Sequence, residues 1–77
     1  MTRDEFLGAV RSNNIRPDAF ELDGQGNERY VLADRHGRWD VYYGERGLET
    51  RVRHFSTESA ALEYLLGTLQ GDPSTRL

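Results

Sequence analysis

The chain has 77 residues, no cysteine and a formal net charge of −3 at pH 7. A chain of this length makes one small domain, which buries only about 60% of the surface that its unfolded form exposes. Without cysteine it forms neither a disulfide framework nor a thiolate metal site. The acidic balance argues against nucleic acid as a partner, because phosphate binding requires clustered positive charge. We expect a cytoplasmic protein with no membrane partner, because no apolar run could span a bilayer and no apolar signal region is present.

The first element predicted in chain order is a helix over about residues 2–13. Thr2 and Glu5 have the spacing of a capping box, and Phe6 and Val10 recur at helical intervals. Pro17 lies beyond the predicted end of the helix and cannot continue it. The chain is therefore expected to turn toward a sheet at this point.

A short extended piece over residues 20–22 and a loop over residues 23–27 lead into two predicted strands. The strands cover residues 29–34 and 38–43, and in the second of them Trp39, Val41 and Tyr43 alternate with Asp40 and Tyr42, as in a half-buried strand. A two-residue loop, His36-Gly37, closes them into a hairpin. This loop length sets two pairs on one face, Leu32 opposite Val41 and Tyr30 opposite Tyr43.

The next turn is predicted to centre on Glu45-Arg46, which two glycines bracket. This turn would place Tyr43 opposite Leu48 and Trp39 opposite Val52 on the inner face, and Asp40 opposite Arg51 and Tyr42 opposite Glu49 on the other. Trp39 and Tyr43 are thus predicted to lie inside. The second face is expected to stay open to solvent and to carry Arg38, Asp40, Tyr42, Glu49, Arg51 and Arg53.

Phe55 falls out of this alternation, so we expect it to leave the strand and pack on a second helix as a hydrophobic staple. Ser56 or Thr57 caps that helix, and Gly71 and Pro73 end it. Its apolar face is predicted to consist of Ala61, Leu62, Leu65, Leu66 and Leu69. The domain would then cover residues 1–73, with residues 74–77 as a flexible tail.

These elements predict an α+β fold. An antiparallel meander needs one face covered, and two amphipathic helices at the ends of the chain can cover it. The expected architecture is a two-layer sandwich, an antiparallel β-meander of three to four strands with an N-terminal and a C-terminal helix on one face.

No residue pattern indicates an active site. His36 lies in a tight turn and is interpreted as solvated, whereas His54 is interpreted as packed or hydrogen-bonded where the last strand leaves the sheet. Asp40 and Glu45 could form a carboxylate pair for acid–base chemistry, but an ion pair between Asp40 and Arg51 is the simpler interpretation. No histidine–carboxylate spacing matches a metal motif. We therefore predict a protein that is not an enzyme, without catalytic residues, metal or cofactor.

Protein binding is easier to motivate than catalysis. Tyr42 is predicted on the open face among arginines, and tyrosine and arginine often supply the binding energy of interfaces. The alternative is a solvated sheet face on which Tyr42 is only a good strand former. The candidate partner-binding residues are Asp40, Tyr42, Glu45, Arg46 and Arg51.

The residues of the central strand and turn also carry a family resemblance. The pattern Trp39-x-Val41-Tyr42-Tyr43-x-Glu45-Arg46-Gly47, followed by Phe55-x-Thr57-Glu58-x-x-Ala61 and Tyr64-Leu65-Leu66, resembles a family of small bacterial immunity proteins. Members of this family are encoded beside secreted toxins of polymorphic-toxin systems, including toxins with NAD-glycohydrolase domains. The resemblance extends from Ile15 to Leu66 and departs from the family pattern in a shortened loop after Gly24.

The resemblance implies an immunity protein that neutralises a cognate toxin by direct binding and occlusion of its active site. The Glu45-Arg46 turn is the motif that it implies as a toxin contact. The partner would be the toxin, and the protein itself a monomer or weak dimer. The alternative is a non-catalytic protein-interaction or regulatory module unrelated to a toxin.

Overall fold

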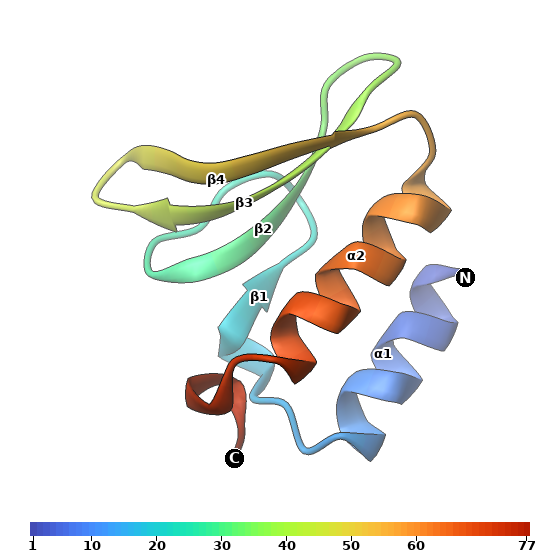
Figure 1. Ribbon diagram of the computed structural model, residues 1–77, viewed down its shortest axis with the longest axis vertical. Coiled ribbons are helices and arrows are strands. Elements are labelled where there is room, and N and C mark those ends of the chain that lie inside the picture. Colours follow the sequence, from blue (N-terminus) through green and yellow to red (C-terminus); the bar gives the residue numbers. More distant parts are fainter.

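The chain folds into a sheet of four strands with two helices packed against one face, as Figure 1 shows. The computed structural model describes residues 1–77. In chain order the elements are α1 (Arg3–Ser12), the 3-10 turn η1 (Pro17–Ala19), β1 (Phe20–Glu21), β2 (Arg29–Asp34), β3 (Trp39–Glu45), β4 (Leu48–Phe55), α2 (Glu58–Gln70) and the 3-10 turn η2 (Pro73–Thr75). The predicted α+β class and the positions of the two helices are confirmed. None of the helices is both long and apolar enough to cross a membrane.

Both helices begin at side-chain caps. Thr2 Oγ1 accepts a hydrogen bond from the Glu5 N–H at 3.1 Å, and Glu5 Oε1 accepts one from the Thr2 N–H at 2.7 Å. These two bonds complete the predicted capping box of α1. The Thr57 hydroxyl accepts from the Ala60 N–H at 3.1 Å, so Thr57 rather than Ser56 caps α2.

The main core lies between the helices and the sheet. From α2 it takes Ala61, Leu62, Leu65 and Leu69, all fully buried, with Leu66 partly buried beside them, so the predicted apolar face is confirmed. From α1 and the strands it takes Phe6, Val10, Tyr30, Leu32 and Val41. Trp39 and Tyr43 were predicted inside, and both pack partly buried against this core.

The sheet is mixed rather than purely antiparallel. Its strand order is β1-β2-β3-β4, and β2, β3 and β4 form the predicted antiparallel meander. The short strand β1 instead runs parallel to β2, with Phe20 beside Tyr30. The connection between them therefore crosses over the sheet, and it does so on the face away from the helices, where the Tyr42 hydroxyl donates to the Gly24 carbonyl at 2.9 Å.

The β2–β3 hairpin has the predicted register, with Leu32 opposite Val41 and Tyr30 opposite Tyr43. Its two loop residues both have positive φ, 56° at His36 and 98° at Gly37. Two positive φ values give the turn a twist that matches the strands, and the second position favours glycine for this reason.

The β3–β4 hairpin differs from the prediction in two ways. Its turn centres on Arg46-Gly47, with φ values of 52° and 79°, one residue later than expected. A β-bulge follows, in which Arg51, with a φ of 56°, and Val52 together face Tyr42. The four predicted pairings, Tyr43 with Leu48, Trp39 with Val52, Asp40 with Arg51 and Tyr42 with Glu49, are therefore wrong. Tyr43 instead lies opposite Thr50, Asp40 opposite His54 and Trp39 opposite Phe55.

The bulge also explains Phe55. This residue does not leave the strand as expected but is the last residue of β4, opposite Trp39. The extra residue in β4 shifts the parity of everything after it, which brings Phe55 to the helix side. There its ring centre lies 5.2 Å from that of Tyr64, so the predicted packing on α2 is present.

The sheet face away from the helices is covered, contrary to the expectation that it is open. Tyr42 and Asp40 are only 5% and 1% exposed, and Tyr42 packs with Val31 and Ala33 in a second, small apolar cluster. The 22–28 crossover loop covers this cluster. Arg51 lines a concavity on the helix side with Tyr30, so its placement on the far face was wrong.

Residues 75–77 are docked on the rest of the domain. Thr75 is 2% exposed, and its hydroxyl donates to the Leu69 carbonyl at 2.7 Å. Arg76 forms an antiparallel bridge with Ile15, and the Leu77 N–H donates to the Asn14 carbonyl at 2.7 Å. Residues 75–77, which belong to the predicted flexible tail, thus satisfy carbonyl groups left free at the end of α2 and after α1.

Candidate functional site

The most concentrated charge in the structure surrounds the buried carboxylate of Asp40 on the far face of the sheet. His54 Nδ1 lies 2.7 Å from Asp40 Oδ1, and Arg38 Nε lies 3.0 Å from the same oxygen. Arg35 Nε lies 4.0 Å from Oδ2. Burial acts to raise the pKa of Asp40, but the bonds from His54 and Arg38 together outweigh it and hold the pKa below its usual range.

This cluster joins strands rather than forming a recognisable reactive centre. Asp40 lies on β3 and His54 on β4, so their contact links the ends of two neighbouring strands. A buried carboxylate can orient an imidazole for proton transfer, yet Asp40 is the only hydrogen-bonding partner of His54, and no hydroxyl nucleophile is bonded to the ring. No group of three or more histidine, cysteine, aspartate or glutamate side chains is placed to hold a metal ion.

The five predicted contact residues do not share one surface. Asp40 and Tyr42 are buried on the far face, where Tyr42 lies beneath the guanidinium of Arg35 at 5.6 Å from the ring centre. Arg51 lies on the helix side. Only Glu45 and Arg46 are exposed together, in the turn at the tip of the β3–β4 hairpin.

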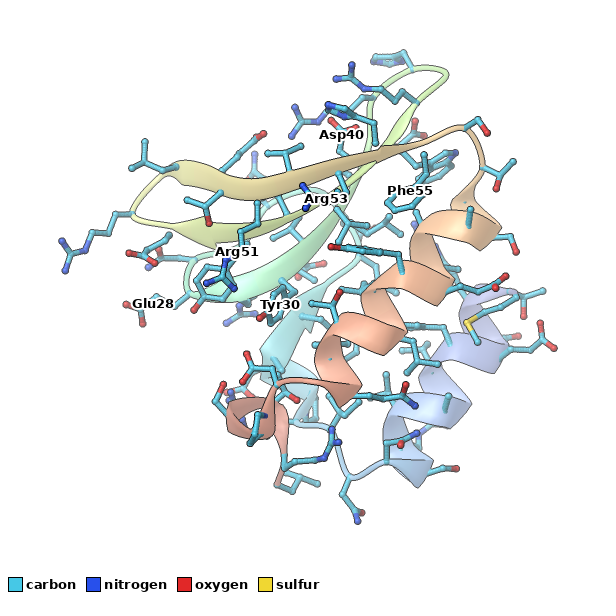
Figure 2. All side chains as sticks on the ribbon, in the orientation of Figure 1. Glu28, Tyr30, Asp40, Arg51, Arg53 and Phe55 are labelled. Carbon is cyan, nitrogen blue, oxygen red and sulfur yellow. The ribbon has the colours of Figure 1, made fainter.

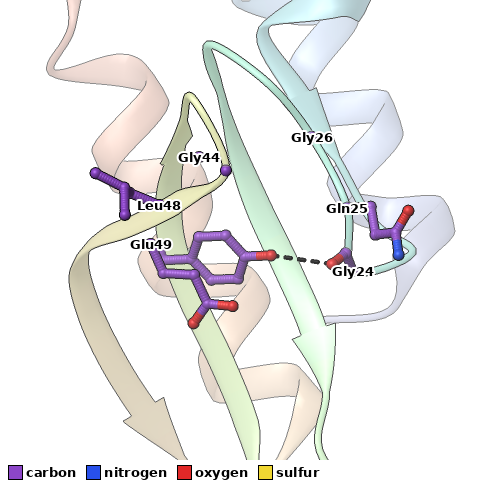
Figure 3. Close-up of a pocket in the computed structure, with 8 residues that line it drawn as sticks. Gly24, Gln25, Gly26, Gly44, Leu48 and Glu49 are labelled. Atoms are coloured by element: carbon purple, nitrogen blue, oxygen red, sulfur yellow. Dashed lines mark hydrogen bonds between the residues drawn. The ribbon is translucent and has the colours of Figure 1, made fainter.

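The tip of this hairpin projects away from both helices (Figure 1) and carries the best candidate surface. We define the hairpin-tip surface as residues 45–48 together with an adjoining depression of about 380 Å³. Figure 3 shows this depression, which is lined by Gly24, Gln25, Gly26, Tyr42, Gly44, Gly47, Leu48 and Glu49. Leu48 at its rim is 66% exposed, although it is a large apolar side chain.

The hairpin-tip surface is held in place by the crossover loop. The Arg46 N–H donates to Asn27 Oδ1 at 2.9 Å, and the Glu28 N–H donates to the Gly44 carbonyl at 2.6 Å. A side chain at Gly44 would collide with the carbonyl of Gly26, so glycine is required for this close approach. The tip is thus a positioned surface with one apolar anchor, Leu48, one cation, Arg46, and two exposed carboxylates, Glu45 and Glu49.

Sequence reasoning missed Leu48. It was placed inside, opposite Tyr43, because the turn was set one residue too early. With the turn at Arg46-Gly47, Leu48 pairs with Glu45 at the end of the sheet, beyond the reach of the helices.

Neither the family models, nor the curated proteins, nor the solved structures contain a match to this chain.

Proposed function

We propose that this domain acts by binding another protein through the hairpin-tip surface, without catalysis, and that its partner is a secreted bacterial toxin whose active site it occludes. The observation that carries the proposal is the exposed Leu48 beside a glycine-lined depression at a positioned hairpin tip. The identity of the partner class rests on the resemblance of the Trp39–Gly47 motif to immunity proteins.

The composition of the surface supports a protein partner. Burying an exposed leucine in an interface is favourable because apolar surface leaves water, and an adjacent arginine supplies the charged contact that interfaces often use. Arg46 has no carboxylate partner within the chain, so its guanidinium is free for one on another protein. A standard interface buries about 800 Å² per partner, roughly a sixth of the 4795 Å² accessible surface of this protein.

The test is a binding and protection assay with the toxin encoded in the adjacent gene. Arg46→Glu combined with Leu48→Ser reverses the charge and removes the apolar anchor at the tip. The control combines Arg11→Glu with Leu77→Ser, which makes the same changes at exposed positions outside the hairpin. Tyr42→Ala is unsuitable as an interface variant, because Tyr42 is buried.

We expect the tip variant to bind the toxin at least about 100-fold more weakly and to lose protection in co-expression. The control should bind like the parent, and all three proteins should keep the same circular dichroism spectrum. The tip variant should keep the melting temperature of the parent, whereas the control should melt slightly lower, because Arg11→Glu places an acid in the last turn of α1. Full protection by a folded tip variant would place the interface elsewhere. A parent protein that neither binds nor protects against the toxin would overturn the proposed partner.

A further inference from the structure

Strand β4 forms an open edge of the sheet, because β3 is its only neighbour. All eight of its residues are exposed or partly exposed, and Leu48 at its start is 66% exposed. An open edge invites pairing with another strand, and charged side chains and bulges restrict which strand can pair. The charges and the bulge of β4 therefore decide what this edge can accept.

The backbone of Glu49 faces the open edge. In an antiparallel pair, opposite residues exchange either both hydrogen bonds or none, and the two kinds of pair alternate along the strands. Glu49 lies opposite Gly44, whose carbonyl accepts from the Glu28 N–H on the β2 side. Because Gly44 directs its backbone to β2, the N–H and C=O groups of Glu49 are left free at the edge.

The backbone of His54 faces the open edge for the same reason. The Arg35 N–H donates to the Arg38 carbonyl where the β2–β3 hairpin closes. Alternation from this bonded pair directs the backbone of Asp40 to β2. His54 lies opposite Asp40 in β4, so its N–H and C=O groups are also free at the edge.

We propose that two copies of this chain pair antiparallel through their β4 strands, with Glu49 of each copy opposite His54 of the other. Outside the bulge, the free backbone groups could also be opposed as Glu49 with Glu49 or as His54 with His54. Those two registers oppose like side chains and overlap only the ends of the strands. The proposed register opposes an acid and a base, overlaps the whole of β4 and sets the two bulges opposite each other at a two-fold axis.

The proposed register also matches the faces of the two strands. With the bulge counted as one position, Thr50 lies opposite Arg53 of the second copy, and Leu48 lies opposite its Phe55. All four side chains belong to the helix side of the sheet, where Figure 2 shows Arg53 and Phe55. The pairing would thus bury the exposed leucine against an aromatic ring.

On the far face, charges of opposite sign would alternate across the axis. Within one copy, Glu49 Oε2 lies 2.6 Å from an Arg35 nitrogen, and His54 Nδ1 lies 2.7 Å from Asp40 Oδ1. Pairing would join these contacts into the row Arg35, Glu49, His54 and Asp40, in which each carboxylate adjoins basic groups. The two-fold axis repeats this row, so the favourable contact occurs twice.

The arginines of β4 select this register rather than block the edge. A register shifted by one residue, about Val52, would set Arg51 opposite Arg53 of the second copy, and like charges directly opposite destabilise strand pairing. In the proposed register the two Arg51 side chains lie near the axis. Each lines a concavity with the carboxylates of Glu45 and Asp72, which offset its charge.

The absence of cysteine from the chain allows a direct test of the register. Thr50→Cys and Arg53→Cys place thiols opposite each other in the dimer, with Cα atoms about 4.5 Å apart, which suits a disulfide. The two copies of either single cysteine would be diagonal neighbours, about 7–8 Å apart and beyond that range. An equimolar mixture of the two variants under mild oxidant should therefore give a disulfide-linked dimer at least tenfold more efficiently than either variant alone. Thr50→Cys mixed with Glu63→Cys, an exposed position on α2, is the matched control.

Sedimentation equilibrium measures the association itself. The mass of the parent should rise toward twice that of the chain as its concentration increases. Glu49→Arg sets an arginine opposite His54 twice per dimer, so it should weaken association about tenfold, whereas Glu63→Arg on α2 should leave it unchanged.

The inference is overturned by a parent that stays monomeric up to about 1 mM, by equal association of Glu49→Arg and the parent, or by a mixture that cross-links no better than its single variants or the control. The dimer would cover Leu48, so a second copy and a partner at the hairpin-tip surface would exclude each other. Because neither experiment contains a toxin, their outcome is independent of the assay that tests the proposed function.

Discussion

The carboxylate of Asp40 offers the sharpest test of how this sheet is held together. The proposed change is Asp40→Asn, which keeps the shape of the side chain and removes its charge. Asparagine can still accept one hydrogen bond, but its amide group then meets Arg38 or His54, which are both donors when charged. The substitution therefore converts a buried attraction into a mismatch.

The size of the effect follows from the burial of the partners. Hydrogen bonds to charged groups contribute about 1.5–3 kcal/mol each when buried. The Arg38 and His54 side chains are 53% and 55% exposed, so solvent screening reduces the contribution of each contact to the free energy of unfolding to about 1 kcal/mol. We expect Asp40→Asn to lower the free energy of unfolding at pH 7 by about 2 kcal/mol. A domain of this length has a total of about 4–12 kcal/mol.

The pH dependence has a defined sign. The pKa of Asp40 is lowered in the folded state, so the carboxylate stabilises the fold above its unfolded pKa of about 3.9. This stabilisation is lost as the pH falls through the lowered folded pKa. The difference in unfolding free energy between the parent and Asp40→Asn should therefore shrink as the pH falls below about 4.

Urea denaturation of both proteins at pH 7, 5, 4 and 3 measures this difference. Asp23→Asn is the control, because the Asp23 side chain is 84% exposed and its ion pair is long, 3.5 Å. An Asp40→Asn variant within about 0.5 kcal/mol of the parent at pH 7 would refute the reasoning, since surface substitutions have effects of that size. A difference that grows between pH 4 and pH 3 would contradict the sign of the pKa shift of Asp40.

Three further predictions concern the regions that differ from expectation. Tyr42→Phe should lower the free energy of unfolding by about 1 kcal/mol, because it leaves the Gly24 carbonyl without its donor, whereas Tyr64→Phe, at a side chain 38% exposed, should have no effect in the same thermal melt. Equal melting temperatures of Tyr42→Phe and Tyr64→Phe would show that the hydrogen bond of Tyr42 does not stabilise the crossover loop. Thr75→Val should remove the donor to the Leu69 carbonyl and lower the melting temperature by about 4–8 °C, with Thr68→Val as control. An unchanged melting temperature would support the flexible tail that the sequence predicts. Arg51→Gly should raise the free energy of unfolding by up to about 1 kcal/mol by relieving the positive φ, and destabilisation would mean that its side chain has a structural role.

The features that could be predicted from the sequence are those with local causes. Thr2 and Glu5 define the start of α1 because a capping box involves only neighbouring residues. The His36-Gly37 loop sets the β2–β3 register because only one placement gives glycine the second left-handed position. Both signals act within a few residues and need no knowledge of tertiary contacts.

The predicted register of the β3–β4 hairpin is wrong because the sequence Gly44-Glu45-Arg46-Gly47 is compatible with two turns, one centred on Glu45-Arg46 and one on Arg46-Gly47. The turn with glycine at its second position, Arg46-Gly47, is the one that matches His36-Gly37 and the one that forms. The bulge at Arg51 is reflected in the sequence only by Phe55, where the alternation of apolar and polar residues breaks. A chain that leaves the strand before Phe55 would explain that break equally well. The predicted contact surface depended on which face of the sheet each residue occupies, so the error in register also placed contact residues on the wrong face.

The burial of Tyr42 had no local signal at all. It depends on the crossover loop passing over the far face, which follows from the parallel pairing of β1 with β2. A two-residue strand carries too little pattern to indicate its direction. Of the candidate contact residues named from the sequence, Glu45 and Arg46 at the turn are exposed, whereas the burial of Asp40 and Tyr42 and the exposure of Leu48 could not be identified.

The docking of residues 75–77 beside α1 has a consequence for biosynthesis. Helix α1 leaves the ribosome before its packing partners in α2 and in residues 75–77. At a synthesis rate of about 5–20 residues per second, residues 61–76 are made roughly 3–15 s after Phe6 and Val10. The β2–β4 meander, in contrast, has only local contacts to complete. We expect a nascent chain stalled before residue 58 to hold a protease-sensitive α1, and the domain to become resistant only after Arg76 has emerged.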